Sequence, residues 1–104
     1  MKRSAFLVLL GSVVLAASGA AAAERAATKV EIEKKAVGKT FRAGMKYHAN
    51  GRYTFQGGSP GRYKISNGQI CVRFDAGGSR CDKILVDGAK FTMVNSSGKR
   101  FAFE

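Results

Sequence analysis

The residues best suited to chemistry in this sequence are the arginines and lysines in the middle of the chain. From Lys34 to Arg73 there are nine basic residues and no aspartate or glutamate. A surface of one charge sign attracts anionic partners, and salt weakens that attraction. Arginine also suits bidentate contact with phosphate, sulfate or carboxylate groups. The pattern predicts contact with an anionic polymer or an acidic protein through Arg42, Lys46, Arg52, Arg62, Lys64 and Arg73.

A second interpretation of these cations is purely physical. Lysine and arginine on the solvent face of a sheet keep a protein soluble and protect its edge strands from aggregation. Base stacking on single-stranded nucleic acid would need aromatic residues on the same face as the cations. The aromatic residues are expected on the opposite face, so specific nucleic-acid recognition is not predicted.

His48 is the only histidine and the one candidate for acid–base chemistry. A catalytic histidine normally has an acid nearby, and no carboxylate lies within ten residues of His48 in the sequence. We therefore expect a protein that is not an enzyme, with a small hydrolase or ribonuclease using His48 as the alternative. One histidine and two cysteines do not suggest a metal site, and no glycine-rich segment has the context of a phosphate-binding loop, so no cofactor is expected.

The elements that must position these residues are strands. In residues 41–48 apolar and polar residues alternate, with Phe41, Met45 and Tyr47 on one face. Turn dipeptides then recur at short intervals, which is typical of an antiparallel meander. The expected fold is all-β: a small antiparallel meander forming a closed or nearly closed barrel of about six to eight strands with one disulfide. The turn dipeptides are Asn50-Gly51, Asn67-Gly68, Asp87-Gly88 and Ser97-Gly98.

Turn chemistry also predicts the strand register. A two-residue type I′ turn at Asn67-Gly68 places Arg62 opposite Arg73. A loop centred on Ala76 then brings Cys71 opposite Cys81, within reach of a disulfide. Further turns are predicted to pair Tyr47 with Tyr53, Met45 with Phe55, Met93 with Phe101, and, through a turn at Asp87-Gly88, Ile84 with Phe91.

The same register predicts one continuous apolar face. No long amphipathic helix is available to cover it, so the sheet is expected to close on itself. The face comprises Phe41, Met45, Tyr47, Tyr53, Phe55, Tyr63, Ile65, Ile70, Val72, Phe74, Ile84, Val86, Phe91, Met93, Phe101 and Phe103.

The beginning of the chain has the pattern of a cleaved secretory signal peptide over residues 1–23. Lys2 and Arg3 precede an apolar run that ends in small residues, and the run is short for a membrane span. Removing it lowers the formal net charge from +11 by two, to +9. The expected location is the periplasm or the exterior, where cysteines oxidise. Residues 24–40 are expected to be weakly ordered and residues 41–104 to form the barrel-like domain.

Two motifs resemble known families. The run "GRYKISNGQICVRF…SRCDKILVDG", residues 61–88, resembles small exported proteins of proteobacteria, mostly of unassigned function, which implies a periplasmic β-domain. The stretch "SGKRF" resembles the loop that periplasmic inhibitors of C-type lysozymes insert into the enzyme's cleft. That likeness implies an inhibitory loop at Ser97, Gly98 and Phe101, with phenylalanine where the family has tyrosine.

Overall fold

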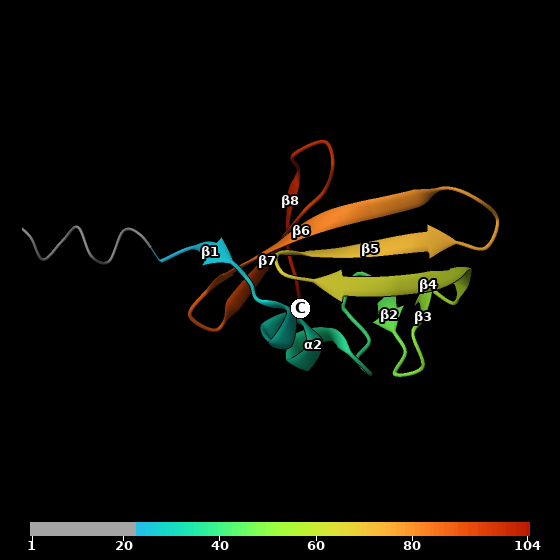
Figure 1. Cartoon of the computed structure of the whole chain (residues 1–104), viewed down its shortest axis with the longest axis horizontal. Helices are drawn as coiled ribbons and strands as arrows, with labels where there is room; N and C mark the ends of the chain where they lie inside the picture. Colours follow the sequence, from blue (N-terminus) through green and yellow to red (C-terminus); the bar gives the residue numbers. More distant parts are fainter. Residues whose placement is uncertain (1–22) are drawn as a thin grey trace, which may run out of the picture.

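The computed structural model describes residues 23–104, and nearly all regular structure in this part is antiparallel sheet (Figure 1). All but the last residue of the predicted signal peptide lies outside the described residues, so the leader stays a prediction. The elements are β1 (Arg25–Ala26), α2 (Lys29–Ala36), β2 (Met45–Tyr47), β3 (Arg52–Phe55), β4 (Gly58–Ser66), β5 (Gln69–Phe74), β6 (Ser79–Asp87), β7 (Lys90–Val94) and β8 (Arg100–Ala102).

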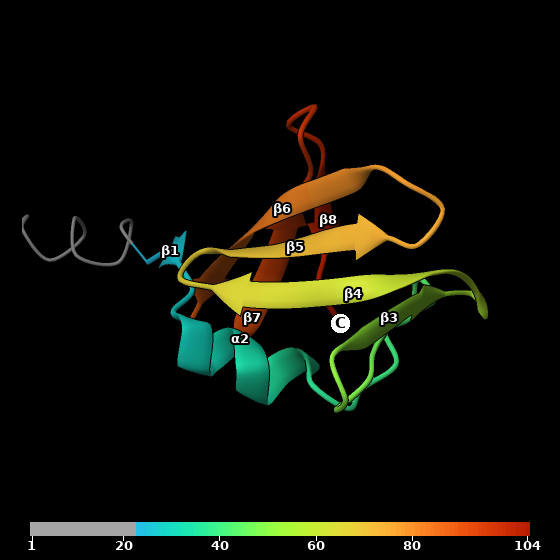
Figure 2. The same ribbon diagram turned by 45° about the vertical axis from the view of Figure 1, so that its right-hand side comes forward.

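The strands form a meander in which each strand from β2 to β8 pairs with the next, and β1 adds to β6. This confirms the predicted all-β antiparallel fold. Figure 2 shows how the sheet curls, so that β7 and β8 pass behind β4 and β5 as a half-barrel. Its two ends, β2 and β8, are not neighbours in the sheet, although the Arg42 amide beside β2 donates to the Glu104 carbonyl oxygen at 2.8 Å.

The predicted register of the central hairpins is confirmed. Arg62 lies opposite Arg73 across β4 and β5. Cys71 lies opposite Cys81 across β5 and β6, and the two form the predicted disulfide. The register also pairs Tyr47 with Tyr53, Met45 with Phe55, and Met93 with Phe101, as predicted.

The turn between β6 and β7 differs from the prediction. Asp87 pairs with Lys90, so the turn residues are Gly88 and Ala89, and Ile84 faces Met93 rather than Phe91. Gly88 has φ +62°, and Ala89 has no positive φ. Glycine at the first central position favours a type II′ turn, whereas type I′ needs positive φ at both positions. The shift is two residues, so every side chain keeps its predicted face.

Residues 24–40, for which weak order was expected, contain a defined helix. The Thr28 hydroxyl accepts a hydrogen bond from the Glu31 amide, and the Glu31 carboxylate accepts one from the Thr28 amide, which together form a capping box. Ile32 and Ala36 are fully buried against the sheet. A helix of this length is only marginally stable by itself, so it depends on packing against the sheet. The local sequence pattern does not reveal that packing, and for this reason the helix was not predicted.

The core lies inside the curl and is rich in aromatic side chains. The rings of Phe41 and Phe103 stack with centroids 4.2 Å apart, and Tyr47 packs edge-on against Phe41 at 5.6 Å. Two residues expected in the core are exposed instead, Phe55 at 37% and Phe101 at 44%. Both lie near the ends of the sheet, where the half-barrel is open. The other fourteen predicted core residues are buried or partly buried in this cluster.

Candidate binding surface

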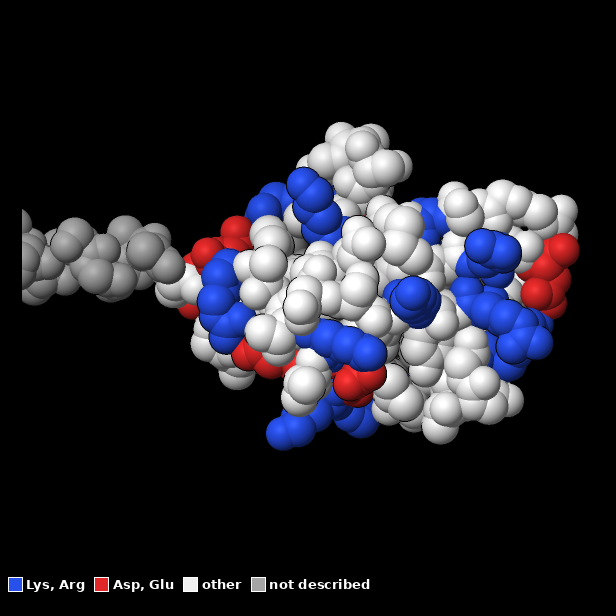
Figure 3. All heavy atoms as spheres, viewed as in Figure 1, with Lys and Arg blue, Asp and Glu red and all other residues white. Residues whose placement is uncertain are grey.

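Three arginines form a row across the outer face of β3, β4 and β5. Arg52 lies directly opposite Arg62, which in turn lies opposite Arg73. Directly opposed residues in antiparallel strands point to the same face, with Cα atoms about 5 Å apart. Figure 3 shows basic side chains gathered over the end of β4 and β5 that is remote from β1. We call Arg52, Arg62 and Arg73 the arginine row.

One acidic residue partly neutralises the arginine row. The Arg52 guanidinium makes a two-pronged contact with the carboxylate of Asp75, which follows β5. This hydrogen bond raises the pKa of Arg52 and lowers the pKa of Asp75, and the positive charges of Arg52 and Arg62 lower the latter further. The Asp75 amide donates to the Pro60 carbonyl oxygen at 2.9 Å, which holds Asp75 beside the row.

Arg62 and Arg73 are the members of the row that stay available. Both are exposed, and neither has an ion pair with any residue in the range 23–104. Lys64 is also exposed, two residues along β4 from Arg62 and opposite Cys71, so it points to the same face. The predicted site is therefore centred on these three cations.

The remaining two predicted residues lie farther from this centre. Lys46 is half-buried on β2, opposite Thr54, one strand beyond Arg52. Arg42 precedes β2, and its guanidinium lies 3.6 Å from the Glu104 carboxylate at the end of the chain. The structure thus brings together Arg52, Arg62, Lys64 and Arg73, with Lys46 at the edge, and sets Arg42 apart.

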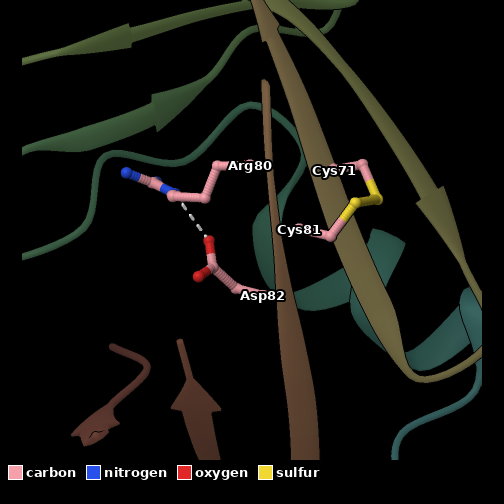
Figure 4. Close-up of a disulfide and its surroundings, with 4 residues drawn as sticks. All are labelled: Cys71, Arg80, Cys81 and Asp82. Carbon is pink, nitrogen blue, oxygen red and sulfur yellow. Dashed lines mark hydrogen bonds and ion pairs between the residues drawn. A yellow bond between two sulfur atoms is a disulfide. The ribbon is translucent and has the colours of Figure 1, made fainter. Parts of the chain in front are cut away.

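A further cation, Arg80, was missed by the sequence analysis because it lies on the inner face. Its Nε donates to the carboxylate of Asp82 at 2.8 Å, and its Nη2 donates to the Tyr53 hydroxyl at 3.2 Å. Figure 4 shows Arg80 and Asp82 on the side of β6 opposite the Cys71–Cys81 disulfide. The alternation of side chains along β6 could have predicted this inward position, since residues 80 and 82 share a face with buried Ile84.

The alternative catalytic residue, His48, has no carboxylate partner among the described residues. Its Nε2 lies 3.1 Å from the Thr54 hydroxyl, and its carbonyl oxygen accepts from the Tyr63 hydroxyl at 2.7 Å. The Asp75 carboxylate, beside the neighbouring residue Arg52 on β3, forms an ion pair with that arginine. Within residues 23–104, no three His, Cys, Asp or Glu side chains come together as a metal site would require. The hydrolase alternative therefore gains no support from this geometry.

The alternative inhibitory loop joins β7 to β8 and projects from the sheet (Figure 1). Its shape is fixed by the Asn95 side-chain oxygen, which accepts from the Ser97 amide, the Ser97 hydroxyl and the Lys99 amide at 2.8–3.0 Å. Phe101 is exposed beyond the loop. The Ser97 hydroxyl is thus engaged within its own turn, and the inhibitor-like role stays a prediction.

Comparison of the chain with protein-family models, curated proteins and solved structures finds no match. Within the described residues no helix combines the length and apolar character needed to cross a membrane. The function of the protein therefore has to be inferred from its own surface chemistry rather than from relatives.

Proposed function

We propose that this protein is an exported, non-enzymatic binding protein of the periplasm or cell envelope that contacts an anionic polymer. The contact is made by Arg62 and Arg73, with Arg52, Lys64 and Lys46 beside them. The observation that supports the proposal is the arginine row, in which cations oppose one another across three adjacent strands.

The row is an unfavourable arrangement for the free protein. Like charges directly opposite each other on neighbouring strands destabilise a sheet. Asp75 forms its ion pair with Arg52, and Arg62 and Arg73, which have no such partner among residues 23–104, repel each other across one strand spacing. A bound phosphate or sulfate group between them would replace this repulsion with charge-assisted hydrogen bonds.

The surroundings of the row favour a polymer over an acidic protein. Stable protein interfaces are usually centred on buried aromatic anchors. Apart from the Cys71–Cys81 disulfide, the outward side chains of β4 and β5 around the row are polar, with Lys64, Ser66 and Gln69 between the arginines and the turn, and no aromatic residue stands among them. The formal charge of +9 on the chain after residue 23 adds long-range attraction to any polyanion.

Retention on lipopolysaccharide-coated beads tests the proposal. We expect retention at low salt and release at about 1 M ionic strength, where the Debye length is about 3 Å. The double substitution Arg62→Ser, Arg73→Ser should weaken low-salt binding by about tenfold, because two charge-assisted contacts are lost. The matched control is Lys90→Ser, Lys99→Ser, which removes the same charge from exposed sites away from the row.

Three results would count against the proposal. If the protein is not retained at low salt, it does not bind this polyanion. If retention is the same at low and high salt, the binding is not electrostatic. An equal loss in the two double variants would show that net charge alone matters and that the arginine row has no special role.

A further inference from the structure

A pocket opens on the inner side of the half-barrel, on the face opposite the arginine row. It has a volume of about 280 Å³ and lies between the β2–β3 end of the sheet and the β7–β8 end. Met45, Met93, Phe55 and Phe101 are the large apolar side chains that line it. Phe55 and Phe101, the two aromatic residues that are exposed against expectation, thus line the same cavity. A ligand bound there would cover both of them.

The pocket also contains one ion pair, Arg80–Asp82, in a wall that is otherwise apolar except for Asn95. Asp82 is only 3% exposed, and one of its carboxylate oxygens, Oδ2, accepts from Arg80 Nε. Within residues 23–104 no group donates to the other oxygen, Oδ1. Figure 4 shows this second oxygen turned away from Arg80. A buried carboxylate oxygen without a donor is costly, and native proteins rarely leave one unsatisfied.

The position of Arg80 is held from several sides. Besides its bonds to Asp82 and the Tyr53 hydroxyl, its guanidinium carbon lies 5.9 Å from the ring centroids of Tyr53 and Phe74. The ion pair is therefore held in one position in the pocket wall. In small-molecule binding sites, a few such fixed polar groups orient the ligand.

The charges select the type of ligand. Arg80 compensates the charge of Asp82, so the pair presents an acceptor without net charge. An anionic ligand would meet the Asp82 carboxylate, and a cation would enter against the positive field of the whole protein. A neutral ligand with a hydrogen-bond donor avoids both penalties.

We propose that this pocket binds a small neutral compound with an apolar body and one hydroxyl group, a phenol or an alcohol. The hydroxyl donates to Asp82 Oδ1, and the body packs between Met45, Met93, Phe55 and Phe101. A cavity of about 150 Å³ suffices for benzene, so this pocket takes a somewhat larger molecule. The inference is independent of the proposed polyanion surface, which uses the other face of the sheet.

Titration of the oxidised protein with 4-ethylphenol and with ethylbenzene, followed by backbone amide NMR shifts, tests this proposal. We expect saturable shifts at residues lining the pocket for both compounds. The phenol should bind about tenfold more tightly, because its hydroxyl satisfies a buried charged acceptor. Shifts confined to other parts of the chain, or no saturable shift, would overturn the proposal and leave solvent as the donor to Asp82.

Two variants separate the polar and apolar parts of the site. The double substitution Arg80→Met, Asp82→Leu should abolish the preference for the phenol, so that both compounds bind equally; replacing both partners of a buried ion pair with apolar residues of similar volume is tolerated in other proteins. Ala102→Trp, at an exposed position lining the pocket, should weaken both compounds at least tenfold by filling the entrance. Ala89→Trp, exposed in the β6–β7 turn, is its control. Wild-type affinity in Ala102→Trp, or a phenol preference that survives the double substitution Arg80→Met, Asp82→Leu, would contradict the assignment.

Discussion

Gly61 shows how a single residue shapes the surface that carries the arginine row. It lies on β4 next to Arg62, and a Cβ atom added there would lie 2.5 Å from the Arg73 carbonyl oxygen and 3.1 Å from the Phe74 Cα. Both neighbours are backbone atoms of β5, which cannot move without disturbing the strand pairing. The absence of a side chain therefore permits the close approach of β4 and β5 beside the row.

Gly61→Ala is accordingly expected to destabilise the protein by about 1–3 kcal/mol, the usual cost of forcing extra atoms into a packed site. Urea unfolding of the oxidised protein measures the change. Gly58→Ala on the same strand is the matched control, because its added Cβ would meet only the Phe55 carbonyl oxygen at 3.8 Å. Equal stability of the two variants would show that the close approach at Gly61 is not needed.

At the scale of elements, helix α2 owes its position to its first turn. The Arg25 guanidinium donates two hydrogen bonds to the Glu31 carboxylate, at 2.7 and 2.8 Å, and the Thr28 amide donates a third at 2.8 Å. The Lys29 amide donates to the Asn67 side chain, which ties the start of the helix to the β4–β5 turn. One glutamate thus joins β1, the helix cap and, through the cap, the sheet.

This glutamate predicts how stability depends on pH. The hydrogen bond from Arg25, followed by that from the Thr28 amide, lowers the pKa of Glu31 from its ordinary value of 4.5 to about 2. A carboxyl with a lower pKa in the folded state stabilises the protein above its unfolded pKa, and this contribution is lost as the pH falls. We expect stability to decrease from pH 4.5 toward pH 2.

Glu31→Gln should lower stability at neutral pH and make the decrease over that acidic range smaller. Thermal unfolding at a series of pH values measures both effects. Glu33→Gln, an exposed position on the same helix, controls for the loss of one negative charge. If stability decreases at acidic pH in Glu31→Gln just as it does in the wild type, the Arg25–Glu31 contact does not contribute to the stability of the fold.

At the scale of the whole molecule, a short chain with a large positive charge needs a covalent support. A domain of this size buries only about 60% of its unfolded surface, and its like charges repel one another. The Cys71–Cys81 disulfide crosses β5 and β6 in the middle of the sheet, on the outer face. It constrains the unfolded chain over a separation of 10 residues.

The double substitution Cys71→Ala, Cys81→Ala is expected to lower the free energy of unfolding by about 2.5–3 kcal/mol, as loop-closure entropy predicts for a ring of this size. Urea unfolding measures the difference. Dithiothreitol should destabilise the wild type by a similar amount and leave the double variant unchanged. If wild type and double variant unfold at the same urea concentration, the disulfide has no role in stability.

The sequence by itself determined the strands, most of the register and the disulfide. These depend on local chemistry: alternation assigns each side chain to a face, and dipeptides such as Asn67-Gly68 admit few turn geometries. The opposition of Arg62 to Arg73 followed directly from that turn. The turn at Gly88-Ala89 was predicted at the wrong position. Because the resulting register shift is an even number of residues, each side chain still lies on its predicted face of the sheet.

Only the tertiary structure decided which parts of the chain meet across the curl of the sheet. The pairing of Arg52 with Asp75, the burial of Ile32 under the sheet, and the exposure of Phe55 and Phe101 all depend on contacts between segments distant in sequence. The pocket depends on where the two ends of the half-barrel stop. No local rule sets these distances, because they result from the accumulated twist of seven paired strands and from the side chains packed inside them.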